Sequence, residues 1–297
     1  MEAFDYDMQC LHPIRLVQGN EVIHVPCGRC MRCLRNRQME WVIRLSHEQL
    51  AHKYTYFVTL TYRDEDMILA SLVNNRCDDV YTYGILCKKH VQDFLKRLRK
   101  NFKLQLKYYF CGEYGKNTFR PHYHGLLFTD KPLSAKDVIG CWKHQDITRN
   151  CFDIAINGAA AGYATKYISK RQFLPYWIKD GDKDIHPFQI MSKGIGVSYL
   201  EDTHVFDYHR DNSIDTIYFD GLKYSLPRYY RDKIFDGHDE QKNVINAFKS
   251  IEVARRQEEI DNMIHESGMK RSDYYSSLFK DEARKEWKKY FNKKEVL

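Results

Sequence analysis

The chain has 297 residues, with 47 lysines and arginines against 40 aspartates and glutamates, and a formal net charge of +7. Hydrophobic residues make up 43% and charged residues 29%, a globular composition that excludes a largely disordered protein. No apolar run approaches the roughly 20 residues that span a bilayer, and the acidic residues 1–7 lack the features of a signal peptide. We therefore expect neither a membrane protein nor a secreted one.

The first half of the chain gives clear local signals. Apolar spacing predicts a helix over 34–52, and a run of β-branched and aromatic residues predicts a strand over 54–62. Residues 63–86 are polar and broken, which indicates a loop with at most a short strand. An apolar stripe beside many lysines and arginines predicts an amphipathic helix over 87–102.

The following elements alternate in type. We expect strands over 104–114 and 122–129, joined by a connection short enough for a hairpin. A helix near 134–142, a strand near 151–156 and a helix over 158–171 come next. This order predicts an α+β domain on a mainly antiparallel sheet. We expect short strands and loops over 176–238 and charged helices over 239–291.

His122 and His124 form the sharpest chemical signal. Side chains alternate along a strand, so both imidazoles point to one face and can chelate a divalent metal. Glu113, near the end of the preceding strand, faces them if the two strands form a hairpin; otherwise it is a surface carboxylate at a turn. Two imidazoles and a carboxylate suit Mg²⁺ or Mn²⁺, which can polarise a phosphate.

A second signal is a pair of Tyr-x-x-Lys repeats. Tyr163 and Tyr167 are four residues apart and share one face of a helix, and Lys166 and Lys170 each follow a tyrosine by three. A tyrosine beside a cation and a polarised phosphate can attack phosphorus. The alternative is a helix that packs two tyrosines into a core and leaves its lysines in solvent.

Nine cysteines include a cluster at Cys27, Cys30 and Cys33. In a chain without an export signal, this spacing indicates a structural zinc site more than disulfides. Cys10 is the expected fourth ligand, with His12 or His24 as substitutes. Reduced thiols and an iron–sulfur cluster are the alternatives.

The amphipathic helix carries basic residues that could contact DNA phosphates. A solvated face over an apolar stripe is an equally good interpretation. The candidate residues are Lys88, Lys96, Arg97 and Lys100.

Four strings occur along the chain: Pro26-Cys-Gly-Arg-Cys30, Phe57-Val-Thr-Leu-Thr-Tyr62, Gly112-Glu-Tyr-Gly115 and Arg120-Pro-His-Tyr-His-Gly125. The His-x-His strand with its later Tyr-x-x-Lys helix resembles the HUH endonucleases. The four strings together resemble the replication initiators of gokushoviruses, small single-stranded DNA phages of the Microviridae. The resemblance covers about residues 10–171. It implies an HUH-endonuclease fold, a mainly antiparallel sheet of the RRM or ferredoxin-like kind flanked by helices.

The resemblance also implies a rolling-circle replication initiator. His122, His124 and Glu113 would hold the metal, and Tyr163 and Tyr167 would be the nucleophiles. One tyrosine would nick the phage origin and keep a 5′-phosphotyrosine bond, and the strand would later be rejoined. Phe57–Tyr62 would be a core strand to which we assign no chemistry. Lys166 is our choice for a helper near the phosphate, with Lys170 as the alternative.

Partners and location follow from the same resemblance. The substrate would be single-stranded phage origin DNA in the cytoplasm of the bacterial host. The chain has no Gly-x-x-x-x-Gly-Lys-Ser/Thr motif, so we expect strand unwinding to come from a host helicase, with synthesis by a host polymerase.

We expect three segments: a cysteine-rich N-terminal element with a basic helix over 1–53, the HUH nuclease core over 54–175, and a C-terminal region over 176–297. Two other functions stay open. One is an HUH transposase or plasmid relaxase. The other is a non-catalytic, zinc-stabilised nucleic-acid-binding protein, in which the tyrosines belong to the core.

Overall fold

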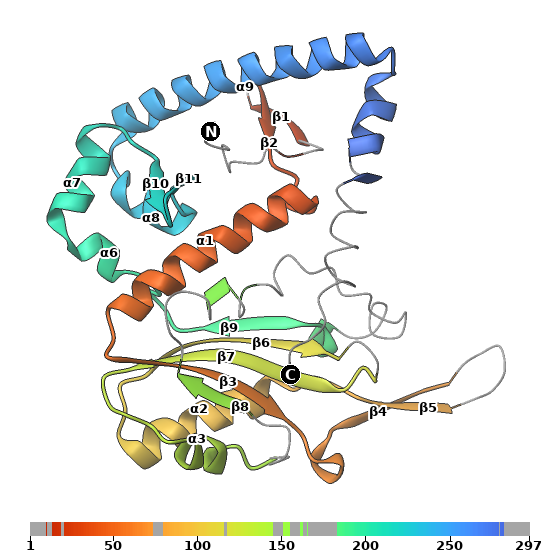
Figure 1. The fold of residues 1–297 in the computed structure, drawn as a ribbon, viewed down its shortest axis with the longest axis vertical. Coiled ribbons are helices and arrows are strands. Elements are labelled where there is room, and N and C mark those ends of the chain that lie inside the picture. Colours follow the sequence, from red (N-terminus) through yellow and green to blue (C-terminus); the bar gives the residue numbers. More distant parts are fainter. Residues whose placement is uncertain are drawn as a thin grey trace. The chain divides into compact units, whose positions relative to one another are not determined.

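The computed structural model of the protein describes residue 10 and residues 14–18, 21–73, 80–115, 118–144, 151–154, 161–162, 165, 183–278 and 280–281. The chain divides into two compact units. One unit comprises Trp41–Tyr199, and the other comprises Met1–Glu40 together with Leu200–Leu297. Figure 1 shows the elements of both units.

A five-stranded sheet forms the centre of the unit Trp41–Tyr199 (Figure 1). Its strand order is β8-β3-β7-β6-β9, and all neighbouring strands are antiparallel. The strands are β3 (Tyr54–Thr61), β6 (Lys107–Tyr114), β7 (Pro121–Thr129), β8 (Cys151–Ile154) and β9 (Phe188–Met191). This confirms the predicted α+β class with a mainly antiparallel sheet between helices, an arrangement consistent with an HUH-like fold. The order β8-β3-β7-β6, with one helix after β3 and one after β7, is that of a ferredoxin-like fold.

Helices α2 (Lys88–Phe102) and α3 (Ala135–Cys141) cover one face of this sheet (Figure 1). The predicted apolar stripe of α2 is confirmed, because Val91, Phe94 and Leu98 are buried against strand residues such as Phe110 and Leu127. The opposite face packs against the second half of α1 (Met31–Leu50). That contact is made by Leu45 and Trp41, which join a cluster with Tyr109, Leu126 and Phe128.

Gly125 lets two strands of the sheet pack tightly. It lies opposite Phe110 in the register of β6 and β7. A Cβ atom at Gly125 would come within 2.4 Å of the Phe110 ring, which is fully buried. A larger residue would therefore force this ring out of the core.

The structure differs from prediction in residues 63–86. The expected loop with at most a short strand is wrong, because a 3₁₀ turn (Asp64–Asp66) precedes a hairpin of β4 (Leu69–Val73) and β5 (Val80–Gly84). This ribbon pairs only with itself and leaves Leu69 and Val80 more than half exposed. Since it buries little apolar surface, its sequence lacks the apolar alternation of a core strand.

Two further predictions meet the structure only in part. The sheet takes its edge strand β9 from beyond residue 175, after a 3₁₀ turn (Lys183–Ile185). Of the helix predicted over 158–171, Ala161, Gly162 and Thr165 are described and helical. The remainder of that segment lies outside the described residues.

The other unit contains two hairpins and several helices. The hairpins pair β1 (Ile14–Gln18) with β2 (Glu21–Val25), and β10 (Thr216–Phe219) with β11 (Leu222–Ser225). The helices are α7 (Thr203–Asp211), α8 (Arg228–Ile234) and α9 (Asp239–Ser267), and the short α6 (Ser198–Glu201) crosses the unit boundary. The expectation of only strands and loops over 176–238 is therefore wrong, whereas the charged helix after 239 is confirmed. None of the described helices is long and apolar enough to cross a membrane.

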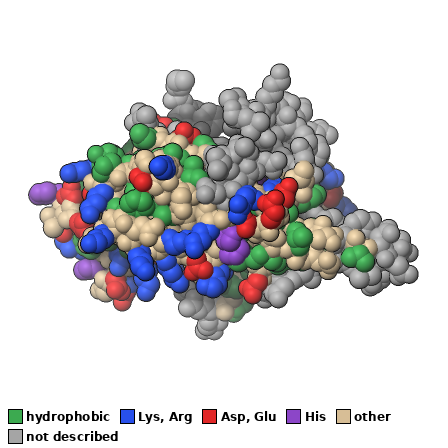
Figure 2. All heavy atoms as spheres, turned by 90° about the horizontal axis from the view of Figure 1, so that it is seen from below, with side chains coloured by type: hydrophobic (Ala, Val, Ile, Leu, Met, Phe, Trp, Pro, Cys, Tyr) green, Lys and Arg blue, Asp and Glu red, His purple; other side chains and the backbone are tan. Residues whose placement is uncertain are grey.

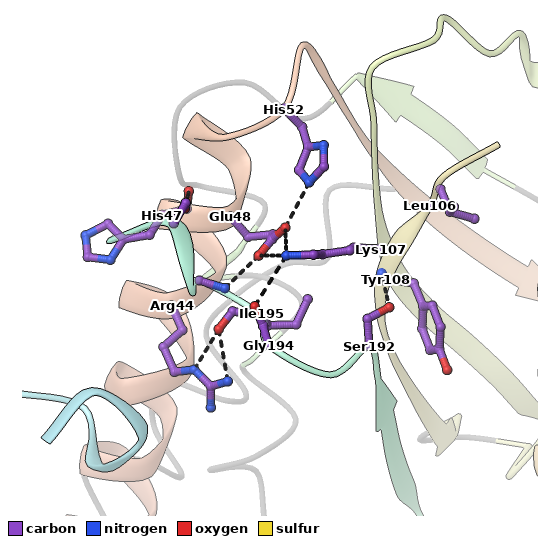
Figure 3. Close-up of polar contacts among 12 residues, drawn as sticks. Arg44, His47, Glu48, His52, Leu106, Lys107, Tyr108, Ser192, Gly194 and Ile195 are labelled. Carbon is purple, nitrogen blue, oxygen red and sulfur yellow. Dashed lines mark hydrogen bonds and ion pairs between the residues drawn. The ribbon is translucent and has the colours of Figure 1, made fainter. Parts of the chain in front are cut away.

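A buried carboxylate fastens the end of α1 to the sheet (Figure 3). Glu48 is fully buried, and its oxygens accept hydrogen bonds from His52 Nε2 at 2.8 Å, Lys107 Nζ at 2.8 and 3.1 Å and the Gly196 backbone N–H at 2.6 Å. Burial by itself raises the pKa of Glu48. The donors outweigh burial, so the pKa lies below its ordinary value of 4.5.

We predict that Glu48→Gln lowers the free energy of unfolding by about 2–3 kcal/mol, because the substitution removes the charge that three buried donors share. The Glu48 carboxylate has its lower pKa in the folded state. Its contribution is therefore complete above the ordinary pKa of 4.5 and is lost as the pH falls through the folded-state value.

The measurement is urea unfolding of wild type and Glu48→Gln at neutral pH and at pH values below 4.5. The difference between the two proteins should shrink in acid. Glu65→Gln, at an exposed residue of the 3₁₀ turn Asp64–Asp66, is the control and should match wild type throughout. Equal stability of wild type and Glu48→Gln at neutral pH would contradict the prediction.

Candidate metal centre

The hairpin of β6 and β7 brings Glu113, His122 and His124 together on one face of the sheet. Glu113 lies directly opposite His122 in the register, and His124 follows two residues later. The expected hairpin connection is present, with Gly115 N–H donating to the Arg120 carbonyl at 2.9 Å. The three side chains point to the face on which α1 packs, because they share the alternation of Leu126 and Phe128.

The ligand atoms of the three residues converge closely. His122 Nε2 lies 2.7 Å and His124 Nε2 lies 3.2 Å from Glu113 Oε1, and the three ligand atoms lie within 4.8 Å of one another. Adjacent ligands of an octahedral ion with bonds of about 2.1 Å lie about 3.0 Å apart. The spacing and the two-nitrogen, one-oxygen donor set therefore fit a single divalent cation.

The local electrostatics keep Glu113 ionised. Burial by itself raises the pKa of this carboxyl, which is only 4% exposed, but hydrogen bonds from His122 and His124 hold the pKa well below its ordinary range. His124 is also buried, whereas the His122 side chain is 21% exposed. The cluster is therefore an anionic ligand set with one side open to a substrate.

Both imidazoles are held through their second nitrogen. The Nδ1 atom of His122 lies 3.1 Å from the Arg120 carbonyl, which can only accept, so Nδ1 carries the hydrogen and Nε2 faces Glu113. The Nδ1 atom of His124 lies 2.9 Å from Thr59 Oγ1, and the Phe57 ring stacks on the same imidazole. Hydrogen bonds of this kind orient metal-binding histidines.

Sequence reasoning missed Thr59 and Arg120. We assigned no chemistry to the strand that contains Thr59, and Arg120 belonged only to a motif. The Arg120 guanidinium bonds the Tyr62 carbonyl and pairs with Asp64, which fastens the start of β7 to the end of β3. The register places Thr59 opposite His124, and no local pattern in the sequence reports that pairing.

The four residues predicted to carry the nucleophilic chemistry, Tyr163, Lys166, Tyr167 and Lys170, lie outside the described residues. Their described neighbour Ala161 is 1% exposed and belongs to the cluster that contains Leu126 and Phe128. Thr165 Oγ1 donates to the Ala161 carbonyl at 2.8 Å, as in a helical turn. Ala161 thus packs on the sheet face that carries the metal ligands.

The basic residues of α2 lie on the other side of the sheet. Lys88, Lys96 and Lys100 are exposed, and Figure 2 shows lysines and arginines on the face where α2 and α3 lie. Arg97 is half-buried, and its Nε donates to the Cys141 carbonyl at the end of α3 at 2.8 Å. Because α2 packs on the face opposite Glu113, His122 and His124, these residues do not line the candidate metal centre.

The candidate zinc ligands also come together. In the unit that contains Met1–Glu40, Cys10, Cys27, Cys30 and Cys33 form a second cluster of possible metal ligands. His12 lies outside the described residues, and the cluster contains four cysteines without His24.

Comparisons with known proteins agree with these observations. Residues 55–172 match a family model of replication-associated proteins, that of the ORF2 type. The chain is 28% identical to replication-associated protein ORF2 of Spiroplasma virus 4, over 69% of this chain and 66% of that protein, just under two thirds of its length. It is 28% identical to replication-associated protein VP4 of Bdellovibrio phage phiMH2K over 80% of this chain and 77% of that protein. It is 24% identical to replication-associated protein ORF4 of Chlamydia phage 1, over 70% and 53%. No solved structure matches the chain.

We predict that Thr59→Val weakens Mn²⁺ binding about 10-fold, because it removes the hydrogen bond that orients His124. Titration calorimetry measures the affinity. Thr55→Val is the matched control: it lies on the same strand and sheet face, and Thr55 Oγ1 has no hydrogen-bond partner among the described residues. Equal Mn²⁺ affinity of the two variants would contradict an orienting role for Thr59.

Proposed function

The chain is related to the replication-associated proteins of gokushovirus-type phages, and from this premise we propose that it initiates rolling-circle replication of phage DNA. The proposed reaction is site-specific nicking and rejoining of single-stranded DNA at the phage origin. The convergence of Glu113, His122 and His124, inside the segment that matches the family model, is the observation that carries this proposal.

The ligand set suits phosphoryl transfer. A divalent cation, Mg²⁺ or Mn²⁺, would polarise the scissile phosphate and offset the negative charge that develops in the transition state. Glu113 contributes the negative charge that attracts the cation. The bonds from Thr59 and the Arg120 carbonyl keep both imidazoles turned toward it before any substrate binds. The exposed side of His122 is where DNA would approach.

Tyr163 and Tyr167 are the proposed nucleophiles. The phenol oxygen of one tyrosine attacks the phosphorus, the bond to the 3′ oxygen breaks, and the released 3′ oxygen takes up a proton. The 5′ phosphate stays esterified to the tyrosine until a 3′-hydroxyl attacks it and re-forms the phosphodiester. Ala161, packed on the sheet face of the metal ligands, supports a nearby position for this segment. Lys166, or alternatively Lys170, would assist as a cation near the phosphate.

The phosphotyrosine ester conserves the energy of the broken bond, so rejoining needs no nucleotide cofactor. The substrate would be origin DNA within the cytoplasm of the bacterial host, and a host helicase and polymerase would unwind and copy it. A transposase or relaxase would use the same ligands with different DNA. A non-catalytic DNA-binding protein would form no covalent product.

The experiment is covalent trapping on overlapping single-stranded oligonucleotides that tile the phage genome encoding the chain, with Mg²⁺ or Mn²⁺. We predict a denaturation-resistant protein–DNA adduct on the oligonucleotides that contain the origin. The double variant Tyr163→Phe/Tyr167→Phe should form none, because it has no nucleophile. In His122→Ala the rate of adduct formation should fall about 100-fold or more, through lost stabilisation of charge in the transition state.

Tyr218→Phe is the matched control, because Tyr218 is 74% exposed on β10 in the other unit, and it should form the adduct like wild type. Thermal unfolding of every variant checks that each is folded. Wild-type protein that binds these oligonucleotides with either metal but never forms the adduct would reject the nickase and leave the non-catalytic binding protein.

A further inference from the structure

Four cysteine sulfur atoms converge at the start of α1, away from the candidate metal centre in sequence and in ligand type. The sulfurs of Cys10, Cys27, Cys30 and Cys33 all lie within 4.8 Å of one another. Cys27 Sγ lies 4.0 Å from Cys33 Sγ, and Cys30 Sγ lies 3.9 Å from Cys10 Sγ. Cys30 and Cys33 are buried at 2% and 9% exposure.

These separations identify the kind of site. They are about twice the 2.05 Å of a disulfide bond. A tetrahedral zinc ion with four Zn–S bonds of about 2.3 Å holds its sulfurs about 3.8 Å apart. The two measured separations match that edge. Thiolates bound to different irons of a multi-iron cluster would need wider spacing, since the cluster itself stands between them.

The backbone around the cysteines donates to their sulfurs. The N–H groups of Arg29 and Cys30 point to Cys27 Sγ at 3.4 and 3.3 Å, and Cys27 N–H points to Cys10 Sγ at 3.2 Å. Gly28 makes this turn with a φ of +69°, a conformation that glycine adopts without strain. Amide donors around sulfur favour the negatively charged thiolate, which is the form that binds metal.

The charge of the neighbouring chain is also suitable. A zinc ion with four thiolates carries a net charge of two minus four, or −2. Arg29, Arg32 and Arg35 stand within the cluster's own segment or directly after it. Positive side chains at this point in the sequence offset a charge that an uncharged cluster of thiols would not have.

The hairpin between Cys10 and Cys27 needs a support of this kind. Strands β1 and β2 form a sheet of only two strands, and Ile14, Leu16 and Val17 are between 44% and 66% exposed. An isolated two-stranded hairpin that buries so little is marginally stable in water. A metal that binds Cys10 and Cys27 would close the chain on both sides of this hairpin.

We propose that Cys10, Cys27, Cys30 and Cys33 bind one zinc ion as four thiolates. The ion has a structural role: it joins the segment at Cys10 to the turn that opens α1 and stabilises the hairpin between them. It is distinct from the cation proposed for Glu113, His122 and His124, because four thiolates fill the tetrahedral coordination of zinc and leave no position for a substrate.

The test is metal analysis of the full chain by plasma mass spectrometry, in a His122→Ala/His124→Ala background that removes the other cluster. We expect one zinc per chain and no iron. Replacing zinc by Co²⁺ should give the intense visible and sulfur-to-cobalt charge-transfer absorption of a tetrahedral thiolate site. Chelation of the wild-type metal should lower the melting temperature, and added zinc should restore it.

Cys30→Ser should lose most of the zinc and the cobalt–thiolate absorption. Cys151→Ser is the matched control: its sulfur donates to Asp153 Oδ2, a bond that serine can also make, and it lies outside the cluster. It should retain the full zinc content. Zinc-free or iron-loaded protein in the otherwise unaltered background, a cobalt spectrum without thiolate bands, or equal zinc loss in both serine variants would overturn the proposal. None of these results depends on nicking activity, so they leave the proposed function to be judged separately.

Discussion

The antiparallel register between β6 and β7 is the constraint on which the rest of the sheet depends. It sets Glu113 opposite His122, and the alternation of side chains sends both residues and His124 to one face. A shift of β7 by one residue would exchange its two faces and place both imidazoles in the core under α2. Gly125 favours the observed register, because the Phe110 ring occupies the space above it.

The two sheet faces have different physical tasks. The face under α2 and α3 is an apolar core, in which Tyr62, Tyr123 and Trp142 are fully buried. The face under α1 combines apolar packing with ionised groups, and Glu48 is stabilised there only when its donors meet it in one geometry. This network favours one placement of the end of α1 over the sheet that carries the metal ligands.

The two clusters of possible metal ligands differ in the chemistry that they allow. Glu113, His122 and His124 offer one oxygen and two nitrogens, a set that leaves coordination positions open and suits a cation acting on phosphate. The four cysteines offer only sulfur and fill a tetrahedron. One chain thus carries an open, hard ligand set on a rigid sheet and a closed, soft one at the start of a helix.

The sequence by itself determined the parts of this protein that depend on local pattern. The strand at 54–62, the helix at 87–102 and the shared face of His122 and His124 follow from side-chain periods of 2 and 3.6 residues. The spacing of Cys27, Cys30 and Cys33 indicated their cluster in the same way. The order of four short motifs indicated the family.

Only the tertiary structure decided which distant residues meet. Thr59 touches His124 because β3 pairs with β7, and β9 joins the sheet from far along the chain. The period of α2 shows which of its sides is apolar, but only the fold shows that this side packs on the sheet face opposite Glu113. Register and packing are set by the combined burial of segments far apart in the sequence, and a local pattern carries no record of that sum.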